Sequence, residues 1–540
     1  MASRQSPTSP DLHSLPVRLR FHQRWLLKAR EFVGRNDGAI WVRGLKALVS
    51  LGYRLKTKAS KMSEGLALDP RAAEPATARL RRTLGRIVDI VEGDRFDGEK
   101  VARLKQRAID QAGRVSQRHP DAYEHLEALG RVYQATGEMR PAADAMIAAF
   151  KKREQRFHDK GLDKYGFRLI PTTQFVRTIG NTALVENYVR AASLGKTEKC
   201  RLILPIHPNV RERLVANPAL LEYWSKYIDI LEDKAEIHRL SFLDPEIYID
   251  PRVIEIEGRV LPFSHAALAY LQSACDERGD PPLFTLSPEH QERGWKELRR
   301  LGLADDDWFV CLHVRTGGYR SADDFREAPV EDYFKAVKEI TDRGGWVFRM
   351  GDPSMPALPD IPRVVDYARS EMKSDWMDIF LCASCRFFVA TSSGLYHLAD
   401  NFGRPYIQTN LLPTGATFFG PRNMFIPKRI IDKASGRELP LCDVMSLDVS
   451  HVCEGGVFRN VLGLELRTNT PEEIADTVVE MIERLDGTVR YSPEDEARQR
   501  RFREMTAEKQ TLFGLDRFPV RCRIGRKFLN ESNIWPNSPI

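Results

Sequence analysis

The chain has 540 residues, enough for about three or four domains of 100–200 residues each. Hydrophobic residues make up 42% and charged residues 29%, a globular balance that excludes a disordered chain, a collagen and a transporter. No run of about 18 apolar residues could span a bilayer, and the N-terminus lacks the apolar core of a secretory signal. Eight cysteines are few for this length, and a long chain builds its core without disulfides. We therefore expect a cytoplasmic protein.

The net charge of +7 is concentrated at one end of the chain. Residues 1–60 hold twelve Lys or Arg residues and three acidic residues, so this part carries +9 and the other 480 residues carry −2. A nucleic-acid-binding surface is not expected from that distribution. The segment 1–63 interleaves basic residues with apolar ones such as Trp25 and Trp41, a pattern that favours peripheral contact with an anionic membrane. A helix packed on the protein with a solvated basic face is the alternative.

The next region, 79–160, has the apolar period of helices, and residues 64–80 read as a linker. Within it, the stretch 126–149 resembles one tetratricopeptide repeat, with Gly130 where two helices would cross closely. The pattern departs at Glu154, where that repeat usually has proline. A single repeat cannot bury its own apolar face. We therefore predict a plain helical hairpin at this place.

From residue 165 onward, short apolar runs alternate with amphipathic segments, which predicts an α/β fold with parallel sheets. The alternation falls into two lobes, at 165–300 and 305–490, followed by a helical tail over 491–540. In the first lobe the pattern predicts strands at Phe175–Ile179 and Arg201–Ile206, a turn at Gly180–Asn181, and a helix from Thr182.

The second lobe has the cleaner pattern. A helix is opened by Pro329 and ended by Gly344 and Gly345. The predicted strands are Trp308–Val314, Trp346–Met350, Arg363–Tyr367, Phe387–Ala390 and Pro405–Thr409. Ligands of such sheets lie beyond the carboxyl ends of the strands, so the residues that follow each strand are the candidates for a site.

The first strand of the second lobe ends in His313 and Val314, and Arg315 and Arg320 follow around a turn with two glycines. A Gly-Gly turn lets a ligand approach the backbone, and guanidinium groups match phosphate oxygens. The alternative is a turn arginine in an ion pair with one of the acids that follow, Asp323, Asp324 or Glu327.

The strand at 387–390 runs into Thr391, Ser392, Ser393 and Gly394 and then into a helix. The hydroxyls therefore lie at a helix N-terminus, where free N–H groups and the helix dipole favour an anion. The simpler interpretation is that one of the two serines is the N-cap. Asp378, on a short helix begun by Ser374, is a candidate carboxylate for a base or a ribose.

The order of these motifs, His-Val-Arg, an acid, Asp-Ile-Phe-Leu, then strand, Ser-Ser and helix, resembles eukaryotic α1,6-fucosyltransferases over about 305–410. It is more similar to a bacterial family of glycosyltransferases found with surface-polysaccharide genes, over about 165–530. The resemblance implies two Rossmann-like lobes of the GT-B type. It also implies transfer of a sugar from a nucleotide diphosphate, GDP-linked by that likeness, to a hydroxyl of a glycan or lipid-linked glycan.

The resemblance also implies roles for single residues. His313 and Asp378 would contact the nucleoside, Arg315 the β-phosphate, and Ser392, Ser393 and Gly394 the diphosphate at the helix end. Asp323 matches the carboxylate that activates the acceptor hydroxyl in an inverting displacement. The sequence departs at Thr316, where fucosyltransferases carry a second arginine, and Arg320 is expected to supply that charge.

Other chemistry has weaker support in the sequence. Cys382 and Cys385 form a single C-x-x-C on an apolar helix, so we expect core packing and no metal or cofactor, the donor being a substrate. No glycine-rich dinucleotide or P-loop motif is present. The alternative function is a non-catalytic scaffold, in which helices bind a partner and the α/β part is a degenerate sugar-nucleotide fold.

Overall fold

A computed structural model describes residues 77–316, 321–416, 420–510 and 521–535. The basic segment 1–63, Arg320 and the end of the tail lie outside these ranges, so the membrane prediction concerns undescribed residues. Within the described residues, no helix combines the length and the apolar character that crossing a bilayer requires.

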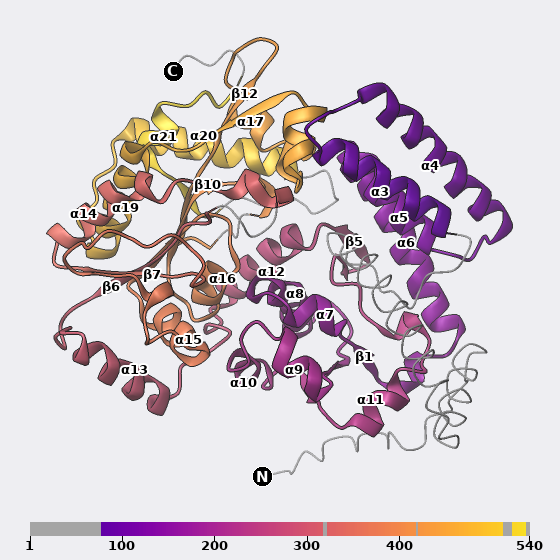
Figure 1. Ribbon diagram of the computed structural model, residues 1–540, viewed down its shortest axis with the longest axis horizontal. Helices are drawn as coiled ribbons and strands as arrows, with labels where there is room; N and C mark the ends of the chain where they lie inside the picture. The colour runs from indigo at the N-terminus through magenta and orange to yellow at the C-terminus, as the bar shows by residue number, and fades with distance from the viewer. Residues whose placement is uncertain (1–76, 317–320, 417–419, 511–520, 536–540) are drawn as a thin grey trace, which may run out of the picture.

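The described chain begins with four helices, and Figure 1 shows them in indigo on one flank of the molecule. The region 79–160, which the sequence predicts to be helical, lies mostly in helices. Gly130 lies where two of them cross, because a Cβ there would be 3.2 Å from Met146 Cγ and 3.3 Å from the Ala142 carbonyl oxygen. The helices are α3 (Ala78–Glu92), α4 (Gly98–Arg118), α5 (Glu124–Ala135) and α6 (Met139–Asp159).

The first lobe is built on a three-stranded parallel sheet in the order β1-β2-β3, beside an antiparallel β4-β5 hairpin. Its strands are β1 (Phe167–Leu169), β2 (Arg201–Pro205), β3 (Asp229–Leu231), β4 (Val253–Ile256) and β5 (Arg259–Pro262). Its helices are α7 (Thr172–Val176), α8 (Ala183–Ser193), α9 (Pro208–Leu214), α10 (Leu220–Trp224), α11 (Lys234–Leu240), α12 (Ser264–Arg278) and α13 (Pro288–Arg300), with 3-10 turns η2 (Asp163–Tyr165), η3 (Ile179–Thr182) and η4 (Pro245–Ile247).

One prediction for this lobe is wrong. The stretch Phe175–Ile179 is not a strand, because it falls in helix α7 and the start of η3. Phe175 packs edge-on against Trp224, with ring centroids 5.6 Å apart, and Thr172 Oγ1 donates to the Pro205 carbonyl oxygen. Packing onto the end of β2 therefore overrides the β propensity of these side chains.

The second lobe contains a seven-stranded parallel sheet in the order β14-β11-β10-β9-β6-β7-β8. Its strands are β6 (Phe309–His313), β7 (Trp346–Arg349), β8 (Val364–Val365), β9 (Phe387–Ala390), β10 (Tyr406–Leu411), β11 (Met424–Pro427) and β14 (Arg523–Ile524), and β12 (Arg429–Asp432) and β13 (Leu464–Arg467) form a hairpin. The tail expected to be helical over 491–540 thus also supplies the edge strand β14.

Helices cover both faces of this sheet. They are α14 (Phe334–Asp342), α15 (Asp375–Ser384), α16 (Gly394–Asn401), α17 (Leu441–Val444), α18 (Leu447–Ser450), α19 (Pro471–Asp486), α20 (Pro493–Gln510) and α21 (Arg526–Asn530). The 3-10 turns are η5 (Ser321–Arg326), η6 (Val330–Tyr333), η7 (Tyr367–Arg369) and η8 (Thr414–Ala416), and η9 (Val457–Val461) is a π turn.

Strand β6 shows how the core is divided. Phe309 and Cys311 join the core that continues into the first lobe, whereas Val310 and Leu312 join the core under α14 and α19. The alternation follows from the two-residue period of a strand. A third core ties the N-terminal helices to both lobes. The prediction of an α/β protein with two parallel-sheet lobes after a helical region is confirmed.

The expected core packing of the C-x-x-C pair agrees with its burial. All eight cysteines are free, and Cys382 and Cys385 are fully buried. Among the described residues, no group of three or more His, Cys, Asp or Glu side chains has an arrangement that could hold a metal ion.

Candidate functional site

The order of the large sheet singles out one place at its carboxyl edge. After β6 the chain adds β7 and β8 on one side, and it then crosses to β9 on the other side of β6. Strands β6 and β9 therefore flank the topological switch point, which is where open α/β sheets bind ligands. The residues at the ends of these two strands are His313–Arg315 and Thr391–Gly394, the two motifs that the sequence marked.

Hydrogen bonds hold the two strand ends together. The Thr391 N–H donates to the His313 carbonyl oxygen at 3.1 Å, and the Arg315 N–H donates to Thr391 Oγ1 at 2.9 Å. Thr391 is fully buried, so this hydroxyl has a structural task. It fixes the backbone from which the Arg315 side chain projects. Thr391 belongs to the predicted motif, but no sequence signal separated it from the two serines that follow it.

Positive side chains lie beside the switch point. Burial, and then Arg315 and Arg349, lower the pKa of His313 to about 4, and Lys373 contributes in the same direction. His313 is therefore a neutral imidazole at neutral pH. Three positive side chains act on this buried ring, and their field favours an anion over a cation there, although Arg349 and Lys373 are paired with carboxylates.

One of these cations, Arg349 at the end of β7, is buried and already partly engaged. Its guanidinium donates to Asp366 Oδ1 and to the Pro356 carbonyl oxygen, both at 2.8 Å. It therefore acts through its field at the site and holds the end of β8 in place.

Asp378 is buried on α15 beside Lys373. The Lys373 ammonium donates to both carboxylate oxygens, at 2.8 and 2.9 Å. Burial raises the pKa of Asp378, and the interaction with Lys373 opposes that rise. The helix does begin after Ser374, as expected. The sequence missed Lys373 as the partner of this acid, although it lies only five residues upstream.

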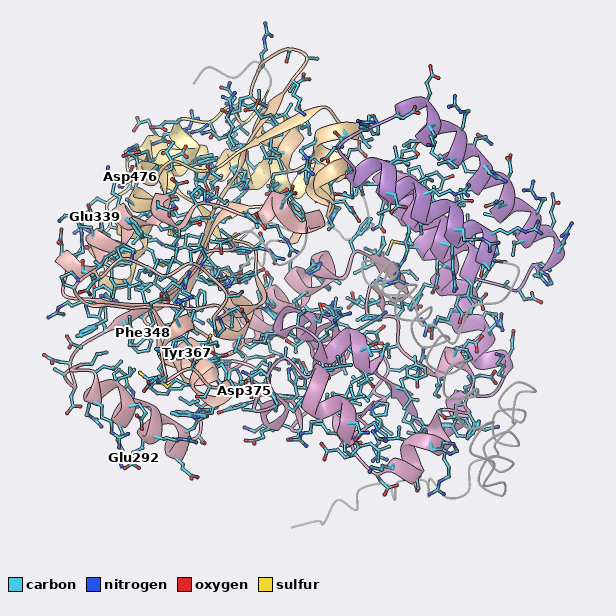
Figure 2. All side chains as sticks on the ribbon, viewed as in Figure 1. Glu292, Glu339, Phe348, Tyr367, Asp375 and Asp476 are labelled. Carbon is cyan, nitrogen blue, oxygen red and sulfur yellow. The ribbon has the colours of Figure 1, made fainter. Side chains whose placement is uncertain are left out.

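Figure 2 labels Phe348, Tyr367 and Asp375 around this corner of the second lobe, and Asp375 lies nearest to the first lobe. The Asn217 side chain of the first lobe donates to the Asp375 carbonyl oxygen at 2.9 Å. The start of α15 is therefore anchored to the first lobe, so the acid that the sequence assigned to a nucleoside lies close to the boundary between the lobes.

The start of α16 differs from a simple capped helix. Ser393 occupies the N-cap position, but its side chain makes no capping hydrogen bond. Among the described residues its Oγ is buried and has no hydrogen-bond partner. The Ser392 hydroxyl accepts from the Leu412 N–H at 3.3 Å. The first N–H groups of α16 are thus not satisfied by either serine, which leaves them suited to an anion.

Gly394 has a role that its sequence context did not predict. A Cβ at this position would lie 2.3 Å from the backbone nitrogen of Gly180 and 2.7 Å from its Cα. Gly180 belongs to η3 of the first lobe, so the two backbones touch at the start of α16. Glycine at both positions allows the lobes to meet beside the switch point.

The loop after β6 carries the remaining candidates. Asp323 lies in turn η5, and its side chain is outside the described residues, as is all of Arg320. Of the two other acids of this loop, Asp324 accepts from the Arg459 guanidinium at 2.6 Å. The backbone oxygen of the other, Glu327, accepts from Lys428 Nζ at 2.7 Å.

Comparison with known proteins gives little beyond this geometry. No protein-family model matches the chain, and no curated protein matches it. Solved structures that it resembles include ADP-heptose LPS heptosyltransferase II from E. coli (13% identity, 45% of this chain and 84% of that one, TM-score 0.29). Another is a family 9 glycosyl transferase from Veillonella parvula (14% identity, 45% of this chain and 80% of that one, TM-score 0.28). At such TM-scores the likeness decides nothing about the activity.

Proposed function

We propose that this chain is a glycosyltransferase that moves a sugar from a nucleotide diphosphate to a hydroxyl of a surface-glycan precursor. One observation carries the proposal: the backbone of Arg315 and the start of α16, which the Ser393 side chain does not cap, meet at the switch point of a parallel sheet. A diphosphate presents the charge and the oxygens that a guanidinium and a helix N-terminus recognise. The resemblance of the motifs to α1,6-fucosyltransferases and the bacterial family favours a GDP-linked donor.

In the proposed reaction the acceptor oxygen forms a bond to the anomeric carbon while the bond from that carbon to the diphosphate breaks. The leaving diphosphate keeps the electron pair and is neutralised by Arg315 and the α16 dipole instead of a metal ion. The acceptor proton passes to Asp323, and the configuration at the anomeric carbon inverts. His313 and Asp378 are the proposed nucleoside contacts, with Ser392, Ser393 and Gly394 at the diphosphate and Arg320 as an added charge.

The first prediction tests the diphosphate site. We expect Arg315→Ala to weaken binding of the preferred nucleotide sugar about ten- to hundred-fold, because it removes a charge-assisted contact of about 1.5–3 kcal/mol. Calorimetric titration with ADP-, GDP-, UDP-, dTDP- and CMP-sugars measures this and identifies the base. The CMP-sugar has one phosphate and serves as the internal comparison.

Arg343→Ala is the matched control, because Arg343 pairs with Glu339 at the exposed end of α14. Equal affinity in Arg315→Ala and the wild type would contradict the assignment. A wild type that is stabilised by none of the nucleotide sugars would favour the scaffold alternative.

The second prediction concerns Asp323. Asp323→Asn keeps the shape of the side chain and removes the base, so we expect turnover to fall about a hundredfold or more while donor affinity changes little. Turnover is measured as release of nucleotide diphosphate from the bound sugar nucleotide, with water or a glycan as the acceptor. Turnover within a few-fold of wild type would move the base to a neighbouring acid or to the first lobe.

We also propose that the basic segment 12–60 gives reversible contact with an anionic membrane. Its +9 charge predicts vesicle binding that weakens strongly above about 0.5 M salt, where charges are screened within a few ångströms. Cosedimentation with anionic vesicles measures this, and salt-independent binding or no binding would contradict it.

A further inference from the structure

Turn η5, which carries the proposed base Asp323, is fastened on one side by a neighbouring acid. Arg459 Nη1 donates to Asp324 Oδ2 at 2.6 Å, and both side chains are about 38% exposed. The two residues are 135 positions apart in the sequence. Directly after Asp324, the buried ring of Phe325 lies 5.6 Å from the ring of Phe458. The turn after β6 is therefore held by two consecutive side chains of η9.

A second hydrogen bond holds the other end of the same loop. Lys428 is buried, and its ammonium donates to the Glu327 carbonyl oxygen at 2.7 Å. Burial lowers the pKa of Lys428 to about 8, although Asp324 and Glu327 act in the opposite direction. Lys428 is therefore a second positive side chain, besides Arg459, that contacts this loop.

Turn η9 is a π turn, a backbone form that is rare in proteins overall but often occurs at functional sites. Two glycines precede it, and the second is sterically required because backbone atoms of α3 face it. A Cβ on Gly455 would lie 2.2 Å from Asp324 Oδ1, and a Cβ on Gly456 would lie 2.2 Å from the Val91 carbonyl oxygen. The segment 455–461 thus lies between η5 and helix α3 and packs closely against both.

The contact with α3 is made by polar groups at the end of that helix. The Gly456 N–H donates to the Glu92 carboxylate at 3.0 and 3.1 Å, and the Asn460 side chain donates to the Val91 carbonyl oxygen at 2.8 Å. The last carbonyl groups of a helix have no partner within the helix, and the Asn460 side chain supplies a hydrogen-bond donor to one of those of α3. The last residues of α3, η9 and η5 form one continuous chain of contacts.

We propose that Arg459 is a positioning residue that holds the loop of the base, and that the N-terminal helices set this position through Glu92 and η9. The inference rests on the proposed function of Asp323 and deepens it. It assigns the helical region a task within this chain, namely supporting the acceptor side of the site. Arg459 acts through Asp324 and need not touch the substrate.

The test uses the full chain and separates turnover from donor binding. We expect Arg459→Gln to lower turnover of the bound nucleotide sugar about tenfold or more, because small misplacements of a catalytic group reduce rates strongly. Donor affinity should remain within about twofold of wild type. Hydrogen exchange of the peptide covering 321–327 should become faster, and this readout does not depend on catalysis.

A second variant acts at a distance. Glu92→Gln removes the charge of the carboxylate that caps Gly456, on a helix remote from Asp323 in sequence, and it should produce the same faster exchange over 321–327 with a smaller loss of turnover. The matched control is Arg467→Gln on β13, where the partner Glu465 is exposed and η5 is not involved. The double variant Asp324→Arg with Arg459→Asp restores the pair in reverse and should recover part of the activity.

The outcomes are distinguishable. Faster exchange in Arg459→Gln and Glu92→Gln, with turnover lost and donor affinity kept, supports the proposal. Unchanged exchange in Arg459→Gln, or an equal loss of donor affinity and turnover, overturns it. Absence of nucleotide-sugar binding in the wild type refutes the proposed function instead, and faster exchange in the two variants would still support the physical link between α3 and η5.

Discussion

At the scale of single residues, the site depends on a threonine that fixes an arginine. The Thr391 hydroxyl accepts from the Arg315 N–H and the Thr391 N–H donates to the strand that carries His313. These bonds place a guanidinium and a neutral imidazole at the same strand end. An anion that enters there meets donors whose backbone positions are already set, which reduces the entropy lost on binding.

The neutral state of His313 gives a pH prediction. Its pKa is about 4 in the free protein because of burial and the nearby Arg315 and Arg349. A bound diphosphate stabilises the imidazolium and raises the pKa of His313. Between the pKa of the free protein and the higher pKa of the complex, the complex therefore binds more protons. Affinity for a nucleotide sugar should therefore rise as pH falls from about 6.5 toward 4, by up to about tenfold per unit of pKa change.

Titration calorimetry at several pH values measures this dependence. A sugar nucleotide is the suitable probe, because its diphosphate has no ionisation in this range. His313→Asn should flatten the dependence between about pH 4 and 6.5. If the variant and the wild type share the same slope, His313 does not lie near the diphosphate.

At the scale of elements, the start of α16 is shaped by its contact with η3. Among the described residues, the Ser393 side chain does not cap the first N–H groups of α16. The Gly180 backbone lies against Gly394 on the side of the first lobe. The anion site is thus formed by the second lobe and bordered by the first, so a change in that contact should affect both stability and binding.

Gly394→Ala tests this contact. Its Cβ would meet backbone atoms of Gly180, which cannot move away as the end of a side chain can. We expect a loss of about 1–3 kcal/mol of stability from overpacking, together with weaker donor binding. Thermal unfolding with and without nucleotide sugar measures both.

The matched control is Gly113→Ala in α4, where a Cβ has open space. Alanine inside a helix should there be neutral or stabilising by about 0.5–1 kcal/mol. Equal unfolding temperatures for Gly394→Ala and the wild type would show that the lobes can separate at this place without cost.

At the scale of the whole molecule, the two lobes are joined by buried charges. Glu186 on α8 is fully buried and contacts His397 of α16 at 2.8 Å between Oε2 and Nε2, and Arg190 at 2.5 Å. Gln272 on α12 donates to Asp400 Oδ2 of α16 at 2.8 Å. Because an uncompensated buried charge is costly, these contacts favour the arrangement in which both lobes meet at α16.

The sign of the Glu186 effect follows from its pKa. Burial would raise this pKa, but Arg190 and His397 outweigh burial and lower it to about 2 from an ordinary value of 4.5. Its stabilisation is therefore present above about pH 4.5 and is lost as pH falls toward 2. We expect Glu186→Gln to cost about 3–5 kcal/mol at pH 7, and the difference from wild type to shrink below pH 4.5.

Urea unfolding at a series of pH values measures this difference. The control is Glu339→Gln in the exposed pair with Arg343, which should change stability by less than about 1 kcal/mol. If the loss of stability in Glu186→Gln stays constant from pH 7 to 3, the assigned ionisation of Glu186 is contradicted.

The sequence by itself determined the local structure of the second lobe. Buried apolar runs predicted β6, β7, β9 and β10, and the 3.6-residue period with a glycine stop predicted α14 and α16. It also marked His313, Arg315 and the serines, because they follow strands and strand ends carry ligands in this fold class. These signals are local, so a single sequence contains them.

Only the tertiary structure decided which of these residues are neighbours. That β6 lies beside β9 brings Arg315 within a hydrogen bond of Thr391, 76 residues away, and no local pattern encodes that strand order. The helix at Phe175, the approach of Gly180 to Gly394 and the pairing of Arg459 with Asp324 are of the same kind. Each depends on packing between segments distant in sequence, and packing energy outweighs the weak local preferences from which a sequence can be interpreted.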